Sequence, residues 1–262
     1  MTINSYLHEK SQALLLTDDE KISISTSIVT LRTRLSSYFP DELSETFIFG
    51  SYDRGTILSR SYDINSDVDF MIVFSDGGYQ PQTYLDKLRR FATNCYGSSD
   101  IAQSHPTIKI DMNHIRFELV PALLSYGQYQ IPSRASGYQN WTYTDPRGFK
   151  TRLQECNKKN KWYIAPTIRL MKHWNVAHGR TFDSYELEQL IVGYFQNKYF
   201  VEGCNYWSYF RQFVENLVIA WDDTQSRRDK VTALKNSVET IKRYISEGRS
   251  TDANNAIERL LP

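Results

Sequence analysis

Cysteine is scarce in this chain, and no apolar run is long enough to cross a membrane. The three cysteines among the 262 residues (Cys95, Cys156 and Cys204) are too widely separated for the paired spacing of a zinc site. We therefore expect reduced thiols, with Cys95 and Cys156 in the core. No signal peptide, lipidation signal or apolar stretch near 20 residues is visible, so the sequence predicts a cytoplasmic protein without membrane contact.

Excess positive charge is also lacking. The 31 Lys and Arg residues are balanced by 30 Asp and Glu residues, which gives a formal net charge of +1. Proteins that grip long nucleic acids usually carry a strongly basic surface, so we expect no long nucleic acid as a partner. Aromatic residues, in contrast, make up 14% of the chain and include 18 tyrosines. A chain of this length can bury a substantial core.

Hydrophobic periodicity predicts an α+β protein with two parts. In residues 1–124, a long amphipathic helix over 17–39 precedes a mixed sheet, with strands over 46–49, 69–74, 107–112 and 115–120 and a helix over 82–96. Residues 125–147 are rich in Tyr, Gly, Ser, Gln and Pro, which predicts an irregular connection. Residues 148–262 are expected to be helical, with helices over 148–158, 162–178, 184–199, 206–222, 227–247 and 251–261.

Two aspartates one residue apart open a strongly apolar strand. Asp67 and Asp69 follow a Gly50-Ser51 turn and a polar loop, and they lead directly into the apolar run 70–74. Alternate side chains of a strand share a face, so both carboxylates point the same way. Neighbouring carboxylates repel each other unless a cation neutralises them, and oxygen ligands suit Mg²⁺. Taken alone, the pair is also typical of a solvated or N-capping Asp pair at a strand start, but with the Gly-Ser turn one loop upstream it favours metal-dependent phosphate chemistry.

This ordered set resembles the polymerase-beta-like nucleotidyltransferase superfamily, whose signature is a Gly-Ser turn, a loop and Asp-x-Asp on the next strand. The resemblance implies a mixed-sheet core followed by an α-helical domain, with the active site in the cleft between them. It also implies a third carboxylate on a later strand. The stretch Glu-Leu-Val-Pro-Ala at 118–122 is similar to the family's Asp-Val-Val-Pro-Ala, which favours Glu118. Asp111, on the preceding strand, is the competing candidate.

Three further segments narrow the resemblance. Gly-Ser-Tyr-Asp-Arg-Gly-Thr at 50–56, Arg-Leu-Met-Lys-His-Trp at 169–174 and Ser-Tyr-Glu-Leu-Glu at 184–188 are similar to stretches of oligoadenylate synthases and of the cGAS/DncV-like nucleotidyltransferases, or CD-NTases. The matches run from about residue 17 to about residue 195. Neither a zinc insertion nor a basic platform is visible. The resemblance therefore points to the bacterial enzymes that make cyclic di- or trinucleotide second messengers in antiphage defence.

The resemblance also implies a reaction and a set of site residues. The reaction is NTP-dependent nucleotidyl transfer that releases pyrophosphate, assisted by two Mg²⁺ ions for which Mn²⁺ can substitute. NTPs, with ATP expected among them, are the substrates, and a downstream effector would bind the product rather than this protein. The implied metal ligands and catalytic residues are Asp67, Asp69 and Glu118. The implied NTP contacts are Gly50, Ser51, Lys172 and Ser184, with Tyr185 stacking on a base.

Two alternatives stay open. A nucleotidyltransferase that acts on tRNA 3′ ends, or a toxin that nucleotidylates protein or RNA, needs a basic surface beside its cleft. Only Lys158-Lys159-Asn160-Lys161 hints at such a surface. A catalytically dead nucleotidyltransferase fold that serves as a binding module would usually have lost one of its carboxylates, whereas this chain retains all three candidates.

Overall fold

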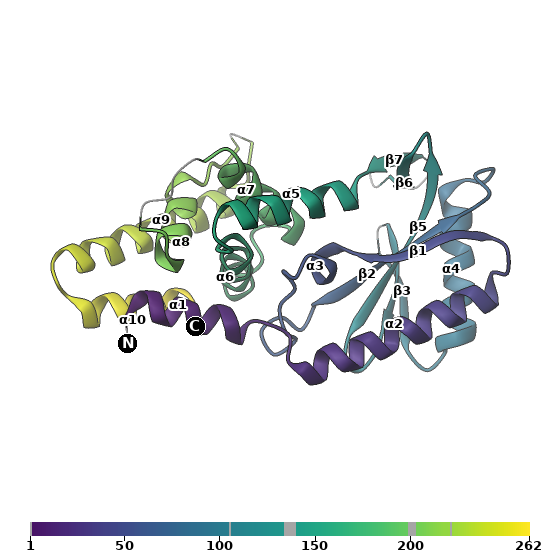
Figure 1. The fold of residues 1–262 in the computed structure, drawn as a ribbon, viewed down its shortest axis with the longest axis horizontal. Helices are drawn as coiled ribbons and strands as arrows, with labels where there is room; N and C mark the ends of the chain where they lie inside the picture. The colour runs from purple at the N-terminus through teal and green to yellow at the C-terminus, as the bar shows by residue number, and fades with distance from the viewer. Residues whose placement is uncertain (1, 105, 134–139, 199–202, 221) are drawn as a thin grey trace. The chain divides into compact units, whose positions relative to one another are not determined.

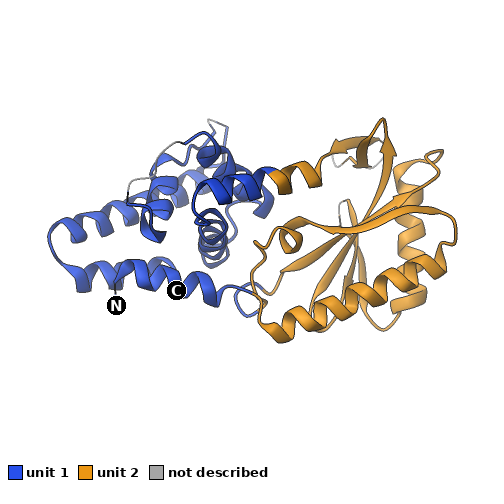
Figure 2. Ribbon diagram, in the orientation of Figure 1, with its two compact units in different colours: residues 1–15, 61–63, 152–262 blue, residues 16–60, 64–151 orange. Residues whose placement is uncertain are grey.

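The computed structural model describes residues 2–104, 106–133, 140–198, 203–220 and 222–262 (Figure 1). These residues form two compact units (Figure 2). Unit 1 comprises residues 1–15, 61–63 and 152–262, and unit 2 comprises residues 16–60 and 64–151. This division differs from the sequence-based one, because the first 15 residues group with the helical part and residues 125–151 group with the sheet.

Unit 2 is built on a mixed sheet of seven strands. The strand order is β1-β2-β5-β4-β3, and β5 also pairs with β6, which pairs with β7. Among the described strands, β2 and β5 run parallel and the other pairings are antiparallel. The strands are β1 (Leu43–Phe49), β2 (Asp67–Phe74), β3 (Asp100–Ser104), β4 (Thr107–Asp111), β5 (Arg116–Ser125), β6 (Gln128–Pro132) and β7 (Trp141–Thr144). The helices are α2 (Asp18–Tyr38), the short α3 (Gly50–Asp53) and α4 (Pro81–Tyr96).

One face of this sheet carries the main core of unit 2. Alternate residues of β2, from Val68 to Phe74, pack with buried residues of α2 and α4 such as Leu31 and Phe91. A capping box starts α2: the Thr17 side chain accepts a hydrogen bond from the Glu20 amide, and the Glu20 carboxylate accepts one from the Thr17 amide. The residues of β2 and β5 that alternate with these core residues point to the other face of the sheet. There they form a smaller cluster of Met71, Val73, Val120 and Ala122.

Unit 1 consists of helices around a central one, α6 (Ile164–Ala177), which is almost entirely buried. It packs against α1 (Ile3–Ala13), α7 (Ser184–Gln196) and α8 (Tyr206–Asn216). The remaining helices are α9 (Gln225–Ser246) and α10 (Ser250–Leu260), while α5 (Pro146–Lys159) begins in unit 2 and ends in unit 1. The two ends of the chain meet here, since the Tyr6 hydroxyl donates to the Leu261 carbonyl at 2.6 Å. No helix among the described residues is long and apolar enough to cross a membrane.

The predicted α+β class is confirmed, but several elements differ from expectation. The connection over 125–147 is not irregular, because it contains β6 and β7 on either side of residues 134–139, which lie outside the described residues. A two-residue turn with positive φ at Tyr126 and Gly127 reverses the chain after β5. The predicted helix over 206–222 stops at Asn216, because Leu217 is extended. Helix α1, helix α3 and strand β3 were not predicted.

Candidate active site

Gly50 stands where β1 ends and α3 begins, in close contact with Asp69. The last residue of β1, Phe49, pairs with Asp69 on β2. Gly50 has a φ of 72°, and a Cβ placed on it would lie 1.7 Å from Oδ2 of Asp69. Any side chain at residue 50 would therefore displace the carboxylate or the turn. The Ser51 carbonyl closes the turn by accepting hydrogen bonds from the Thr56 and Ile57 amides at 2.9 and 3.1 Å.

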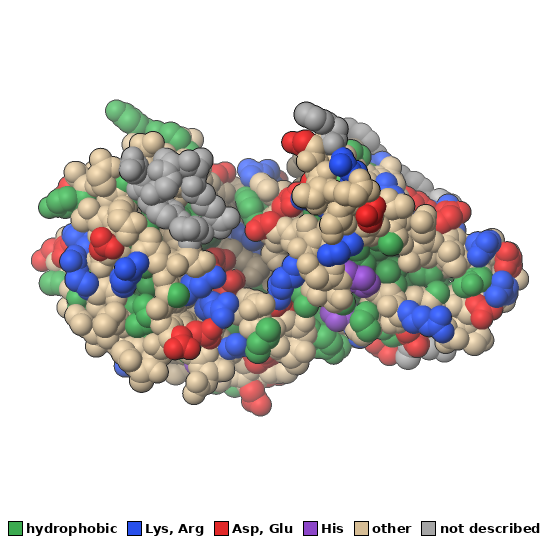
Figure 3. Space-filling view, turned by 180° about the vertical axis from the view of Figure 1, so that it is seen from behind, with side chains coloured by type: hydrophobic (Ala, Val, Ile, Leu, Met, Phe, Trp, Pro, Cys, Tyr) green, Lys and Arg blue, Asp and Glu red, His purple; other side chains and the backbone are tan. Residues whose placement is uncertain are grey.

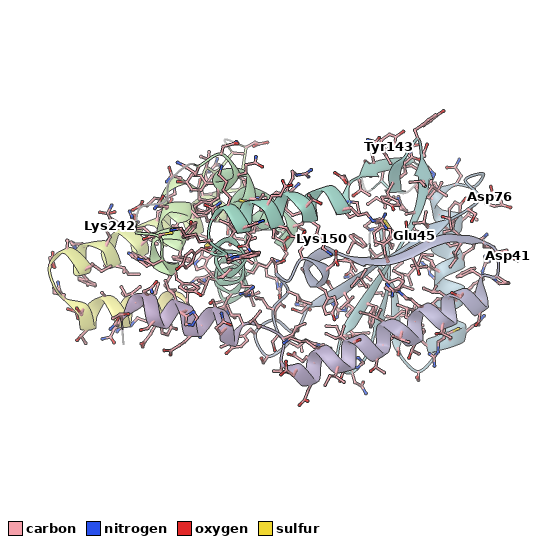
Figure 4. The ribbon with its side chains drawn as sticks, in the orientation of Figure 1. Asp41, Glu45, Asp76, Tyr143, Lys150 and Lys242 are labelled. Carbon is pink, nitrogen blue, oxygen red and sulfur yellow. The ribbon has the colours of Figure 1, made fainter. Side chains whose placement is uncertain are left out.

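Ion pairs connect this turn and β1 to the start of α5 within unit 2. The Lys150 ammonium lies 2.7 Å from Oδ1 of Asp53, in α3, and Arg147 pairs with Glu45 on β1. Lys150 and Glu45 are labelled in Figure 4. The guanidinium of Arg147 also covers the Phe47 ring, with 4.4 Å to the ring centroid. The elements on either side of the Gly50-Ser51 step, β1 and α3, are thus both paired with the start of α5.

The loop between the turn and Asp67 is fixed by the first turn of α2. Oε1 of Glu20 accepts hydrogen bonds from the Ser59 hydroxyl at 3.0 Å and from the Arg60 amide at 3.1 Å. Burial alone would raise the pKa of Glu20, but the hydrogen bonds from Thr17, Arg60 and Ser59 lower it overall. Further along, the Ser66 hydroxyl donates to the Leu58 carbonyl at 2.7 Å, immediately before Asp67.

Strand register brings six charged side chains onto one face of the sheet, in two rows across β2, β5 and β4. The first row is Asp67, Arg116 and Asp111, and the second row is Asp69, Glu118 and Lys109. Register partners on adjacent strands share a face, and the intervening residues of all three strands belong to the main core. All six side chains are half-buried. The predicted carboxylates Asp67, Asp69 and Glu118 therefore occupy the same face of the sheet.

Opposite charges alternate in the first row. Arg116 donates to Oδ2 of Asp111 from Nη2 at 2.6 Å and from Nε at 3.1 Å. The hydrogen bond with Asp111 and the negative charges of Asp111, Asp67 and Glu118 raise the pKa of Arg116, against the opposing effect of burial. Asp111, the competing candidate for the third carboxylate, is thus separated from Asp67 by one strand and is engaged by Arg116.

The second row places two like charges side by side. Asp69 and Glu118 are register partners on strands that run about 4.8 Å apart, a destabilising arrangement for two carboxylates. On its other side, Glu118 is neutralised by Lys109, with 3.0 Å between Oε1 and Nζ. The Thr107 hydroxyl lies 3.2 Å from Oε2 of Glu118. Glu118 therefore stands between the Asp69 carboxylate on β2 and the Lys109 ammonium on β4.

The donor set fits a divalent cation such as Mg²⁺. It offers carboxylate oxygens on one face, and Gly50 contributes no side chain beside Asp69. In the conformation described, however, no three His, Cys, Asp or Glu side chains of the described residues converge closely enough to hold a metal ion. Glu118 lies against Lys109 instead. The sequence analysis did not single out Lys109 and Arg116. The spacing could have indicated them, because Lys109 lies two residues before Asp111 and Arg116 two residues before Glu118, so each shares a strand face with a candidate acid.

The other predicted NTP contacts belong to unit 1. Lys172 on α6 is only 4% exposed, and Glu188 on α7 is fully buried. The Lys172 ammonium lies 2.5 Å from Oε1 of Glu188. This contact favours a structural role for Lys172. Ser184 is the exposed first residue of α7, and Asp183 caps that helix by accepting from the Tyr185 amide at 2.8 Å. The Tyr185 side chain is 42% exposed.

Comparison with known families identifies the chain. Residues 1–157 match the family described as the Second Messenger Oligonucleotide or Dinucleotide Synthetase domain, SMODS. The chain belongs to this family. A probable cyclic nucleotide synthase from Bacillus cereus (strain VD146) is 29% identical over 195 residues, which are 59% of this chain. The match spans 57% of that relative's length.

Solved structures confirm the fold of this SMODS protein. Vibrio cholerae DncV cyclic AMP-GMP synthase, in complex with the linear intermediate 5′ pppA(3′,5′)pG, superposes with a TM-score of 0.80 at 10% identity, over 99% of this chain and 95% of that one. The Bradyrhizobium diazoefficiens CD-NTase CdnG in complex with GTP gives a TM-score of 0.73 at 10% identity, over 98% of both chains. The predicted fold, a mixed sheet with helices followed by a helical region, is thus confirmed.

Proposed function

We propose that this protein is a Mg²⁺-dependent nucleotidyltransferase that joins NTPs into a cyclic di- or trinucleotide second messenger. The observation that carries the proposal is the register of Asp69 with Glu118, beside Gly50, whose missing side chain leaves room for the Asp69 carboxylate. Membership of the SMODS family and the names of the relatives support the same reaction class. Retention of all three carboxylates argues against a catalytically dead binding module.

The chemistry follows from the charges on this face. Two bound divalent ions would supply positive charge for activation of the attacking hydroxyl and for neutralisation of the leaving pyrophosphate. Asp67 and Asp69 would hold these ions, and Glu118 would serve the one beside the attacking hydroxyl. Gly50 and Ser51 would contact the triphosphate, since a glycine turn permits the close approach of a phosphate to the backbone. Ser184 and Tyr185 are proposed as further NTP contacts on the exposed start of α7.

The wider role is proposed from the same resemblance. NTPs, with ATP among them, would be the substrates, and Mn²⁺ would replace Mg²⁺. The reaction would take place in the cytoplasm, where NTPs are abundant, as part of antiphage signalling. A downstream effector would bind the cyclic product. On the face drawn in Figure 3, acidic and basic side chains are interspersed and form no single basic patch, which gives no support to a tRNA-directed enzyme.

The test is an incubation of the full chain with the four labelled NTPs and Mg²⁺ or Mn²⁺, followed by phosphatase treatment and chromatography. We expect small phosphatase-resistant oligonucleotides without added nucleic acid, and a yield that changes little between low and moderate salt. Binding along a tRNA would instead weaken steeply with salt. The Asp69→Asn variant is the matched control and should form no product. Label recovered only on tRNA or protein would replace this proposal with the RNA-directed or toxin alternative.

A further inference from the structure

We propose that Lys109 is a positioning residue that holds Glu118 and competes with divalent cations for it. The inference rests on the proposed function, because it assigns Glu118 to the metal site. Lys109 lies on β4, directly across from Glu118 and on the opposite side of it from Asp69. Glu118 therefore stands between a carboxylate on one neighbouring strand and an ammonium group on the other.

Among the described residues, β4 supplies both the ion pair and the hydroxyl contact of Glu118. Its Oε1 lies 3.0 Å from Nζ of Lys109, and its Oε2 lies 3.2 Å from the Thr107 hydroxyl. That hydroxyl also donates to the Ser104 carbonyl at 2.7 Å, so its single hydrogen cannot serve both acceptors fully. The charge-assisted contact with Lys109 is therefore the stronger of the two. Both partners of this ion pair are largely shielded, with 27% of Lys109 and 16% of Glu118 exposed.

The charge of Lys109 determines how strongly the face attracts a metal. The six charged residues comprise four acids and two bases, so the rows carry a formal charge of −2. Arg116 directs two of its donors to Asp111. Lys109, in contrast, neutralises one of the proposed metal ligands itself. A divalent ion beside Asp69 must draw Glu118 away from this ammonium or share it, and the fixed positive charge opposes the ion over a short distance.

Two consequences follow for a variant without this charge. Divalent ions should bind more tightly to the nucleotide-free protein, because repulsion and competition are both removed. Turnover at saturating metal should nevertheless fall, because Glu118 loses the contact that orients it. A residue needed only for folding would produce neither a gain in metal affinity nor rescue by another cationic side chain. The opposite directions of the two effects distinguish positioning from general damage.

The experiment is a titration of the nucleotide-free full chain with Mn²⁺, in which the electron paramagnetic resonance signal of free Mn²⁺ reports binding. The variants are Lys109→Met, Lys109→Gln and Lys109→Arg. Lys87→Met is the control, because Lys87 forms a comparable ion pair with Glu42 at 2.6 Å in the same unit. Melting curves establish that each variant is folded.

We expect Lys109→Met and Lys109→Gln to lower the Kd for Mn²⁺ by about tenfold, while Lys109→Arg and Lys87→Met stay near the wild type. In the NTP assay, kcat of the first two should fall with KM little changed, and Lys109→Arg should restore it. An unchanged or higher Kd in Lys109→Met and Lys109→Gln, or an equal decrease in Lys87→Met, overturns the inference. Absence of product from the wild type instead overturns the proposed function, whatever the Mn²⁺ titration shows.

Discussion

Gly50 and Asp69 share a space that only one side chain can occupy, since a Cβ at residue 50 would lie 1.7 Å from Oδ2 of Asp69. The Gly-Ser signature and the Asp-x-Asp signature are thus parts of a single steric arrangement. The two signatures lie far apart along the chain, so the sequence alone does not reveal this contact. It forms because Phe49 and Asp69 are register partners on β1 and β2. The arrangement leads to the first prediction.

Replacement of Gly50 by alanine should reduce activity by about 100-fold or more, because it displaces the Asp69 carboxylate. Gly55→Ala is the matched control. Gly55 has nearly the same φ, 70° against 72°, but nothing lies within 4 Å of its added Cβ. Both variants should lose about 1–2 kcal/mol of stability from the left-handed backbone conformation. Turnover and denaturant melts separate the two effects, and equal activity in both variants would contradict the steric account.

The second prediction concerns the repulsion within the carboxylate rows. Asp67→Ala and Asp69→Ala should each abolish product formation while the fold remains intact. Asp69→Asn, which keeps the size of the side chain, should also raise the melting temperature of the metal-free protein by about 1–2 °C, since one of two adjacent negative charges is removed. The gain should shrink as salt is added. Substantial turnover by either alanine variant would exclude the two-metal assignment.

The carboxylate pair could be predicted from sequence because its geometry is local. A period of two places Asp67 and Asp69 on one face wherever the strand lies. The alignment of Glu118 with Asp69, in contrast, depends on the parallel pairing of β2 with β5, which a single sequence does not encode in any short pattern. The family resemblance supplied Glu118, whereas nothing in the resemblance supplied Lys109.

Strands β6 and β7 and the burial of Lys172 were not predicted either, because they also depend on tertiary packing. Strands β6 and β7 are short and half-exposed, so their residues show turn-like composition rather than apolar alternation. The burial of Lys172 also escaped prediction. A lysine on a helix usually reaches solvent, and only the packing of α6 against α7 brings Glu188 to it.

The third prediction separates the two candidates for the third carboxylate. Glu118→Gln should abolish turnover, because it removes a charge from the row that contains Asp69. Asp111→Asn should keep turnover within about tenfold of the wild type, since its carboxylate acts on the site only by holding Arg116. Activities are compared at saturating Mg²⁺, with melting curves for both variants. An inactive Asp111→Asn alongside an active Glu118→Gln would assign the third ligand to Asp111.

The last prediction concerns the buried pair of Lys172 and Glu188. Lys172→Met should destabilise unit 1 by about 3–5 kcal/mol, because it removes the Lys172 ammonium from the fully buried Glu188 carboxylate. Replacing both residues, as Lys172→Met with Glu188→Leu, should recover most of that loss, since apolar side chains of similar size can replace a buried ion pair. Denaturant melts of the two single variants and the double variant form a double-mutant cycle.

The same double variant tests the triphosphate contact that the family resemblance implies for Lys172. A folded double variant with NTP KM within about threefold of the wild type assigns the pair to stability, whereas a large increase in KM with the fold intact would restore Lys172 to the nucleotide site.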